Sequence, residues 1–334
     1  MYSDEDIASA VKAGILTKEI ANEFRNHIAG DNSAPAIDEE SFRLITGFND
    51  IFVVIASLLL LTSVTWIGSS VSLWLGIALQ AATAWGLAEF FTRKRRMALP
   101  SIILLLAFVG GVLATGMIFL QAAGFTKEIS MGGPSVIAAL AAWMHWLRFK
   151  VPITIAAGIG TLVAGIMFLL LASIPETRQW LMLMTFVAGI GVFLLAMMWD
   201  SADTLRQTRR SDVAFWLHLI AAPLIVHPIF AVLNIFETQI DLWQAMAVTA
   251  IYLILAIISI SIDRRALMVS ALIYVLYVFN TVLEQHGVVS LGFAFTAFII
   301  GSGLLLLSAY WHRCRQIIIV RYPVNIQNHL PKLR

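Results

Sequence analysis

Charge is scarce in this sequence. Only 13% of the 334 residues are charged and 60% are hydrophobic, whereas ordinary soluble domains have roughly 25% charged and about 45–50% apolar residues. The net charge of +2 is too small to indicate nucleic-acid binding, and the basic residues are spread over short segments instead of forming one patch. This composition is typical of a membrane protein and argues against a nucleic-acid partner.

Cysteine and catalytic motifs are also lacking. Cys314 is the single cysteine, which excludes an intrachain disulfide and matches no metal-ligand spacing. HExxH, GxSxG and paired-carboxylate motifs do not occur, so we expect no enzymatic activity, no metal site and no cofactor. The first 45 residues are acidic and polar, without a basic start and an apolar core, so we expect no cleavable signal peptide.

Long apolar runs, in contrast, recur along most of the chain. About 20 apolar residues in a helix cross a hydrocarbon core of about 30 Å. The sequence therefore predicts an all-α, polytopic integral membrane protein with about ten transmembrane helices. Hydropathy places them at 48–67, 71–91, 98–122, 132–147, 152–173, 179–199, 213–235, 242–262, 266–283 and 287–311. Residues 1–47 precede this domain, and residues 312–334 form a basic cytoplasmic tail.

The distribution of Lys and Arg predicts the orientation, because basic residues near span ends stay in the cytoplasm. With ten spans, only Lys127 and Arg178 fall on the outer side, so both termini are expected inside. The fourth span, 132–147, is the weakest, because it is short and opens with two glycines and Pro134. A re-entrant segment is the alternative, but it would divide the basic residues almost evenly between the two sides.

The N-terminal segment predicts a short cytoplasmic helical hairpin. Apolar residues recur at helical spacing, Gly14 can end the first helix, and Thr17 can cap a second helix that ends at Gly30. Residues 31–40 read as a polar linker, followed by an amphipathic lead-in at 41–48. The hairpin is either an accessory segment resting on the membrane or a module that docks a protein partner.

This layout resembles a known family. An amphipathic helical pair containing GILTKEIANEF at 14–24, then a polar linker, then closely spaced apolar spans, is similar to the bacterial membrane proteins called domain of unknown function 2157. The resemblance covers roughly the first 120 residues. It implies a polytopic protein of the bacterial inner membrane and supplies no functional residues.

Within or beside the expected spans, acidic residues are confined to the span ends, chiefly Asp50, Glu89, Asp200 and Glu284. Charge buried in a bilayer usually marks function, and its near absence argues against an ion-coupled transporter with a carboxylate at the midplane. Glu89 precedes the basic run RKRR at 93–96, which predicts an ion pair at headgroup level.

The segment FWLHLIAAPLIVHPIF, residues 215–230, holds the most suggestive polar residues. His218 and His227 are half a turn out of phase on a straight helix, so they cannot share a metal ion unless the helix breaks. Pro223 and Pro228 make a break conceivable, since each removes a backbone hydrogen bond. His218 lies near the cytoplasmic end and is expected to be an interfacial or packed histidine.

His227 leads to the sharpest hypothesis about a site. If the helix continues past Pro228, His227 and Asn234 share a face. The ninth span offers a second polar stripe: Tyr274 or Tyr277, then Asn280 or Thr281, then Glu284. One interpretation is an outward-open polar cavity lined by His227, Asn234, Tyr277, Asn280 and Glu284. The alternative is that these groups form hydrogen bonds between packed helices.

Two other motifs are interpreted as structural. Gly158, Gly160 and Gly165 resemble part of a nucleotide-binding pattern, but no strand precedes them, so they predict close helix contact. His145 lies in the sequence WMHWLRF, which predicts an interfacial aromatic and basic cluster touching lipid headgroups.

Three functions stay open at this point. The first is transport or binding of an uncharged or amphipathic solute, since ten spans suit two inverted halves, although the two halves of this sequence show no internal match. The second is a membrane scaffold or sensor whose N-terminal hairpin docks a protein. The third and weakest is a membrane-embedded enzyme that uses His227.

Overall fold

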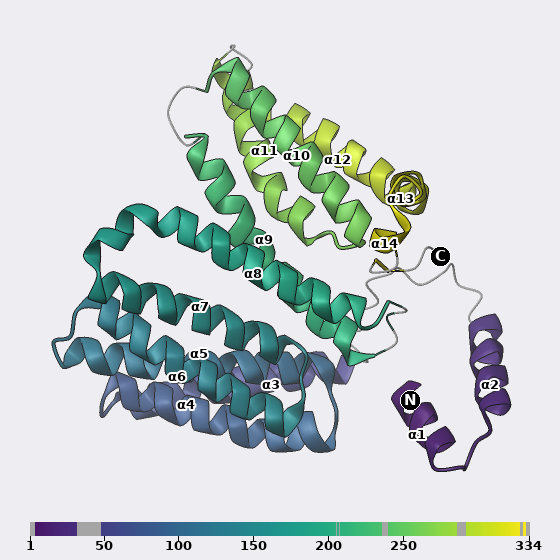
Figure 1. Cartoon of the computed structure of the whole chain (residues 1–334). Helices are drawn as coiled ribbons and strands as arrows, with labels where there is room; N and C mark the ends of the chain where they lie inside the picture. The colour runs from purple at the N-terminus through teal and green to yellow at the C-terminus, as the bar shows by residue number, and fades with distance from the viewer. Residues whose placement is uncertain are drawn as a thin grey trace.

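A computed structural model describes residues 4–31, 48–204, 206, 208–235, 240–285, 292–327 and 330–331, and the regular structure within these residues is helical (Figure 1). This confirms the all-α fold class. Seven helical segments are long and apolar enough to cross a bilayer. They are α3 (Phe48–Ser69), α5 (Ala98–Ala122), α7 (Ile153–Ser173), η2 (Pro175–Trp180) continuing into α8 (Leu181–Ser201), α9 (Arg209–Val232), α10 (Leu242–Ile262) and α11 (Ala266–Gln285).

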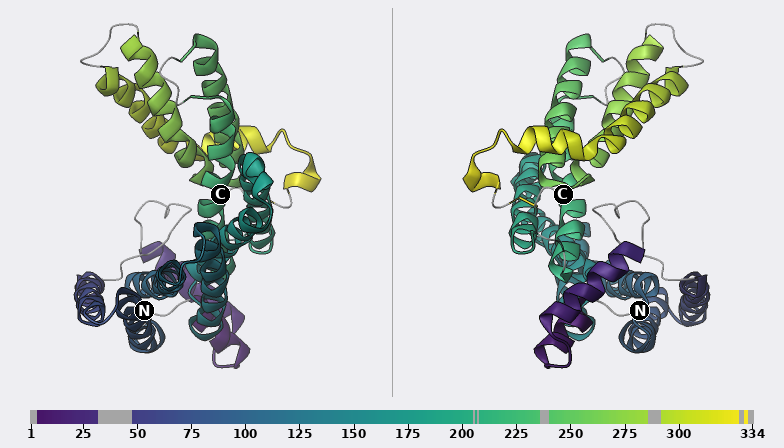
Figure 2. Two further views of the ribbon diagram at one scale, coloured as in Figure 1. Left: turned by 90° about the vertical axis from the view of Figure 1, so that its left-hand side faces the viewer. Right: turned by 90° about the vertical axis from the view of Figure 1, so that its right-hand side faces the viewer.

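Three further helices fall on the remaining expected spans. They are α4 (Leu73–Ala88), which runs into the π-helix η1 (Glu89–Lys94), α6 (Lys127–Phe149) and α12 (Gly292–Ala309). Helices α3 to α7 lie together in one group and α10 to α12 in another, with α8 and α9 between them (Figures 1 and 2). Helix α9 packs against α7, α8 and α11 and is the most buried of the seven. It therefore joins the two groups.

Small residues let neighbouring helices approach closely. A Cβ atom added at Gly165 of α7 would lie 2.8 Å from Val136 Cγ2 and 3.1 Å from the Val136 backbone nitrogen on α6. A Cβ atom at Gly158 would lie 3.3 Å from the Cβ of Ala142 on α6. The interpretation of these glycines as packing residues is confirmed, since helix contact in membranes depends on such close approach.

Helix α6 carries the weakest expected span, and it is continuous over 23 residues with Pro134 inside it. Each end is held by an ion pair. Near the start, Arg178 Nη2 lies 3.0 Å from Glu128 Oε1, and near the end, Arg148 Nε lies 2.8 Å from Glu89 Oε1. Glu128 and Arg148 are separated by about 30 Å along a helix axis, which is about one hydrocarbon thickness. This spacing is what a full crossing requires.

Helix α9 runs without interruption from Arg209 to Val232, with Pro223 and Pro228 inside it. The break that two prolines made conceivable is not seen. Pro228 frees the carbonyl of Leu224, and Gly189 of α8 lies against the backbone there, where an added Cβ would be 2.8 Å from the Leu224 carbonyl carbon. Close packing of α8 thus accompanies the proline in α9.

The N-terminal residues form α1 (Asp4–Lys12) and α2 (Lys18–Asp31), which contact each other. Gly14 has a φ of 71°, a left-handed conformation that suits a residue just beyond a helix end. Thr17 Oγ1 accepts a hydrogen bond from the Ile20 backbone N–H at 3.3 Å, as a helix cap does. Both expected helix boundary signals are confirmed. The linker and lead-in at 32–47 lie outside the described residues, and the docking role of this pair stays a prediction.

The C-terminal segment is helical in part. After α12, helix α13 (Trp311–Ile319) packs against α10 and α12, and α14 (Val324–Gln327) follows. Helix α13 lies across the ends of these helices (Figure 2). The Ser261 hydroxyl and the Tyr322 hydroxyl are 2.9 Å apart, which holds the segment after α13 to α10. The expected basic tail therefore includes a helix that is part of the folded bundle.

Candidate functional sites: a buried ionic network and an apolar groove

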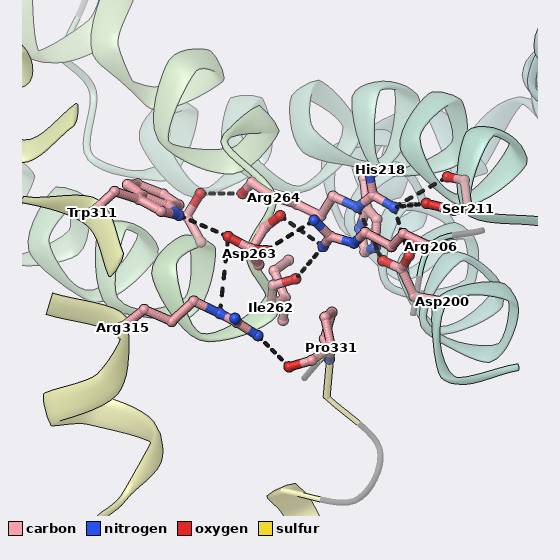
Figure 3. A network of polar contacts seen from close by, with 11 residues as sticks. Asp200, Arg206, Ser211, His218, Ile262, Asp263, Arg264, Trp311, Arg315 and Pro331 are labelled. Carbon is pink, nitrogen blue, oxygen red and sulfur yellow. Dashed lines mark hydrogen bonds and ion pairs between the residues drawn. The ribbon is translucent and has the colours of Figure 1, made fainter. Parts of the chain in front are cut away.

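Asp200, in the last turn of α8, accepts hydrogen bonds from two charged or polar neighbours. Arg264, which follows α10, donates from Nη2 to Asp200 Oδ1 at 2.6 Å and from Nε to Oδ2 at 3.1 Å. His218 Nε2 on α9 lies 3.1 Å from Oδ2. The Arg264 Nη2 also donates to the backbone oxygen and hydroxyl of Ser211, at 3.1 and 3.0 Å. Three segments of the chain therefore meet at one carboxylate (Figure 3).

Asp263 is the second carboxylate, next to Arg264 in the chain (Figure 3). Arg206 Nη1 lies 2.9 Å from Asp263 Oδ2, and Trp311 Nε1 donates to Oδ1 at 2.7 Å. Arg315 Nε is 3.9 Å from Oδ1, and its Nη2 donates to the carbonyl of Pro331. Asp263 thus holds the loop after α8 and the C-terminal helix α13 to the end of α10. We call Asp200, Arg206, His218, Asp263, Arg264 and Arg315 the ionic network.

Local backbone geometry places these side chains. Asp263 has a φ of 57° and ends α10 in a left-handed conformation, which Asp tolerates better than most residues. Ser259 Oγ donates to the Arg264 carbonyl and so fixes the turn. Arg206 Nη2 donates to the carbonyls of Ile262 and Asp263, at 3.3 and 2.9 Å. The turn between α10 and α11 is therefore held by Ser259 from within α10 and by Arg206 from the loop after α8.

The network is almost completely enclosed. Asp200 and His218 are each 1% exposed, and Asp263, Arg264 and Arg315 are also buried. Burial lowers the pKa of the Arg206 guanidinium, and the neighbouring Arg264 lowers it further, while Asp263 opposes the shift. Arginine nonetheless stays charged in proteins. The two carboxylates therefore face three guanidinium groups, and each charge in this low-dielectric site depends on its partners.

The contact with Asp200 places a proton on Nε2 of His218. A carboxylate can only accept, so Nε2 carries the proton that faces Asp200. Nδ1 is buried and has no hydrogen-bond partner among the described residues, and the ring packs edge-on against Phe193 with centroids 5.3 Å apart. Together with the bond from Arg264 to Ser211, these contacts tie the end of α8 to α9 and to the turn after α10.

The sequence pointed only partly to this network. Asp200 was expected as an acid at a span end and His218 as an interfacial or packed histidine, of which the packed alternative is right. From sequence alone, Arg206, Arg264 and Arg315 indicate only the orientation of the chain, because hydropathy treats every loop charge as water-exposed. The sequence does contain one signal for the network. It has an acid at a span end, a histidine in the next span, and arginines in two loops expected on the same side.

The predictions for His145 and Glu89 have opposite outcomes. His145 is 0% exposed, with the rings of Trp85, Phe108 and Phe149 around it and Thr154 Oγ1 3.4 Å from Nδ1. Of these rings only Phe149 belongs to the segment WMHWLRF, so the cluster is a buried one between helices and not the expected interfacial one. The expected headgroup contact is wrong because α4, α5 and α7 cover the ring. Glu89 forms the expected ion pair, to Arg93 at 3.4 Å and more closely to Arg148.

The residues of the expected polar cavity fall into separate pairs. His227 Nδ1 lies 2.9 Å from the Tyr274 hydroxyl, which joins α9 to α11. On α11, Asn280 Nδ2 donates to Glu284 Oε1 at 2.8 Å, and Tyr277 is exposed. Asn234 lies beyond the end of α9, exposed, with a φ of 51°, so it does not share a helix face with His227. Their lining of one outward cavity stays a prediction.

An apolar groove of about 440 Å³ lies between α10 and α11. Its volume falls within the range of about 300–1,000 Å³ that is usual for small-molecule sites. The hydroxyl of Thr249, a lining residue, is bonded to the Ala245 carbonyl at 2.8 Å, so the lining offers little free polarity. The lining residues are Leu242, Ala245, Met246, Thr249, Ala250, Leu253, Phe279 and Val282.

Two polar residues, Asp241 and Gln244, each precede a lining residue of the groove in the chain. Asp241 precedes the lining residue Leu242, and its backbone N–H donates to Gln244 Oε1 at 2.7 Å. Gln244 Nε2 donates in turn to the Leu233 carbonyl at 3.0 Å. The groove lining is therefore apolar, and the amide of Gln244, next to it in the chain, is bonded to backbone groups.

Comparisons with known proteins add no assignment. No family model, curated protein or solved structure matches this chain. The resemblance to domain of unknown function 2157 therefore stays an expectation from sequence layout. Among the described residues, no group of three or more His, Cys, Asp or Glu side chains is placed to hold a metal ion.

Proposed function

We propose that this chain is a multi-pass protein of the bacterial inner membrane that binds an amphipathic or uncharged solute in the groove between α10 and α11. The observation that carries the proposal is the groove itself, which has a volume of about 440 Å³ and an almost wholly apolar lining. Binding there is the first step that transport of such a solute would need.

We further propose ten crossings with both termini in the cytoplasm. The ion pairs support this topology, because each joins loops expected on one side. Glu89 with Arg148 joins the second and fourth loops, Glu128 with Arg178 the third and fifth, and Arg206 with Asp263 the sixth and eighth. On this topology the groove lies in the outer half of the bilayer.

The first prediction tests the groove. Ala250 is an exposed lining residue, so Ala250→Trp fills the space without disturbing the buried side of α10. We expect at least a tenfold weaker affinity for a pyrene-labelled fatty acid, measured by fluorescence titration of the purified protein in a neutral detergent. Ile254→Trp is the matched control, because Ile254 is exposed on the same helix outside the groove. Equal affinities in both variants and the unaltered protein would contradict the proposal.

A second candidate function is protein docking through the N-terminal helices. Ile15, Ile20 and Phe24 are exposed apolar side chains in or beside α2, and exposed apolar groups on a short helical pair favour a partner surface. If deletion of residues 1–30 leaves the proteins recovered in a pull-down unchanged, this candidate is excluded.

A further inference from the structure

Helix α13 has three distinct faces. The first consists of Trp311, Arg315 and Ile319, which are four residues apart and buried against the bundle. The second is polar and exposed, and it includes His312 and Gln316. The third is exposed and apolar, and it includes Ile317 with Tyr310 just before the helix. Residues seven apart lie within about 20° on a helix, so Tyr310 and Ile317 are on the same side.

The apolar face of α13 continues a larger apolar surface. On α12, Leu305 and Leu306 are exposed just before Tyr310, and beyond α13 Val320 and Val324 are exposed as well. Exposed apolar side chains on an apolar span such as α12 are those that face lipid. Because α13 lies across the ends of α10 and α12 (Figure 2), its apolar face meets the membrane at the level where these helices end.

Two arginines accompany this face. Arg313 is four residues before Ile317 and therefore on the same side of α13, and its guanidinium lies 5.9 Å from the centroid of the Tyr310 ring. Arg321 is exposed just after the helix. Neither has a carboxylate partner among the described residues. Arginine pairs with phosphate through two parallel hydrogen bonds, and its apolar stem can lie along lipid.

We propose that α13 is an in-plane helix of the cytoplasmic leaflet and that Arg313 and Arg321 bind the phosphate of an anionic phospholipid. Tyr310 and Ile317 lie among the acyl chains, while Gln316 faces water. The first face is fixed to the protein through Trp311 and Arg315, so the lipid contact is made at a defined position on the bundle. This proposal rests on the membrane location of the chain and not on solute binding in the groove.

The orientation of α13 is tested with the full-length protein in nanodiscs. In a Cys314→Ala background, an environment-sensitive fluorophore is attached in turn at Ile317→Cys and Gln316→Cys. We expect blue-shifted emission at position 317 and emission typical of water at position 316, because neighbouring residues face different solvents. Water-like emission at both positions overturns the in-plane placement.

The headgroup preference is tested by titrating short-chain phosphatidylglycerol into the purified protein labelled at position 316. One basic residue near an anionic surface contributes about a fivefold factor in affinity. We therefore expect a Kd about fivefold higher in Arg313→Gln and about 25-fold higher in Arg313→Gln/Arg321→Gln. Arg178→Gln, an exposed arginine in the η2 segment, is the control and leaves the Kd unchanged.

Three results would contradict the lipid assignment. Short-chain phosphatidylcholine that binds as tightly as phosphatidylglycerol would remove the role of charge. Inorganic phosphate that displaces phosphatidylglycerol at equal concentration would show that the ligand is a free anion. An unchanged Kd in the double variant would show that these arginines do not hold the headgroup. Failure of the groove experiment, in contrast, would leave this proposal intact.

Discussion

Arg264 and Asp200 form a deeply buried ion pair, with side chains that are 3% and 1% exposed. Removing one partner of a buried pair leaves an uncompensated charge, which typically destabilises a protein by about 3–5 kcal/mol. We expect Arg264→Met to lower the free energy of unfolding by about this amount, measured by denaturant titration of the purified protein in detergent. Arg178→Met is the control, since Arg178 is 74% exposed beside Glu128 and such pairs contribute about 0–1 kcal/mol.

A double substitution separates pairing from packing. In Asp200→Asn/Arg264→Met both charges of the pair are removed, so no unpaired charge is left behind. We therefore expect the combined destabilisation to be smaller than the sum of the single effects. A strictly additive result would mean that the two side chains stabilise the fold through separate contacts.

The two buried histidines should respond differently to loss of their polar atoms. His218 bonds to Asp200, so His218→Phe leaves a carboxylate with one partner fewer and lowers the thermal midpoint. His145 lies among aromatic rings, its Nε2 has no partner among the described residues, and its Nδ1 has only the long 3.4 Å contact with Thr154 Oγ1. An unsatisfied buried polar atom is unfavourable, so we expect His145→Phe to leave the midpoint unchanged or raise it. A large loss in His145→Phe would reveal a polar role for that ring.

Gly165 tests how tightly α6 and α7 pack. An added Cβ would lie 3.1 Å from the Val136 backbone nitrogen and 3.2 Å from the Gly132 carbonyl oxygen, and backbone atoms cannot move aside as side chains do. We expect Gly165→Ala to destabilise the protein by about 1–3 kcal/mol, measured as above. Gly191→Ala on α8 is the control, because nothing lies within 4 Å of an added Cβ there. It should be neutral or slightly stabilising.

The sequence predicted whole helices well and their contacts poorly. The span expected at 98–122 coincides with α5, and the one at 242–262 coincides with α10, because hydrocarbon admits only a backbone whose hydrogen bonds are satisfied within the helix. The network escaped prediction because Asp200 and Arg264 lie 64 residues apart, and no local pattern records such a pairing. The shared helix face expected for His227 and Asn234 failed for a related reason. Helix α9 ends at Val232, and where a helix ends depends on tertiary packing that the local sequence does not show.

Single-cysteine labelling tests the topology of the whole chain. In a Cys314→Ala background, we expect Glu176→Cys to react with a membrane-impermeant maleimide added to intact cells and Arg95→Cys to react only after permeabilisation. If α6 did not cross, Glu176→Cys would be on the inside and would stay unlabelled. Asn280→Cys extends the test to the expected outward cavity, with the exposed Ile273 of the same helix as the lipid-facing control. Labelling at 280 but not 273 would support a water-filled cavity.

The burial of Arg206, Arg264 and Arg315 implies two successive roles for the same guanidinium groups. On the proposed topology, these groups are hydrated charges that keep their loops in the cytoplasm while the chain is being inserted. After the helices assemble, they are enclosed and bonded to Asp200, Asp263 and Pro331. Orientation is thus decided before the charges are sequestered. Loss of these arginines would cause an error at synthesis and, separately, a shorter lifetime of the assembled protein, and the two defects would appear at different times after translation.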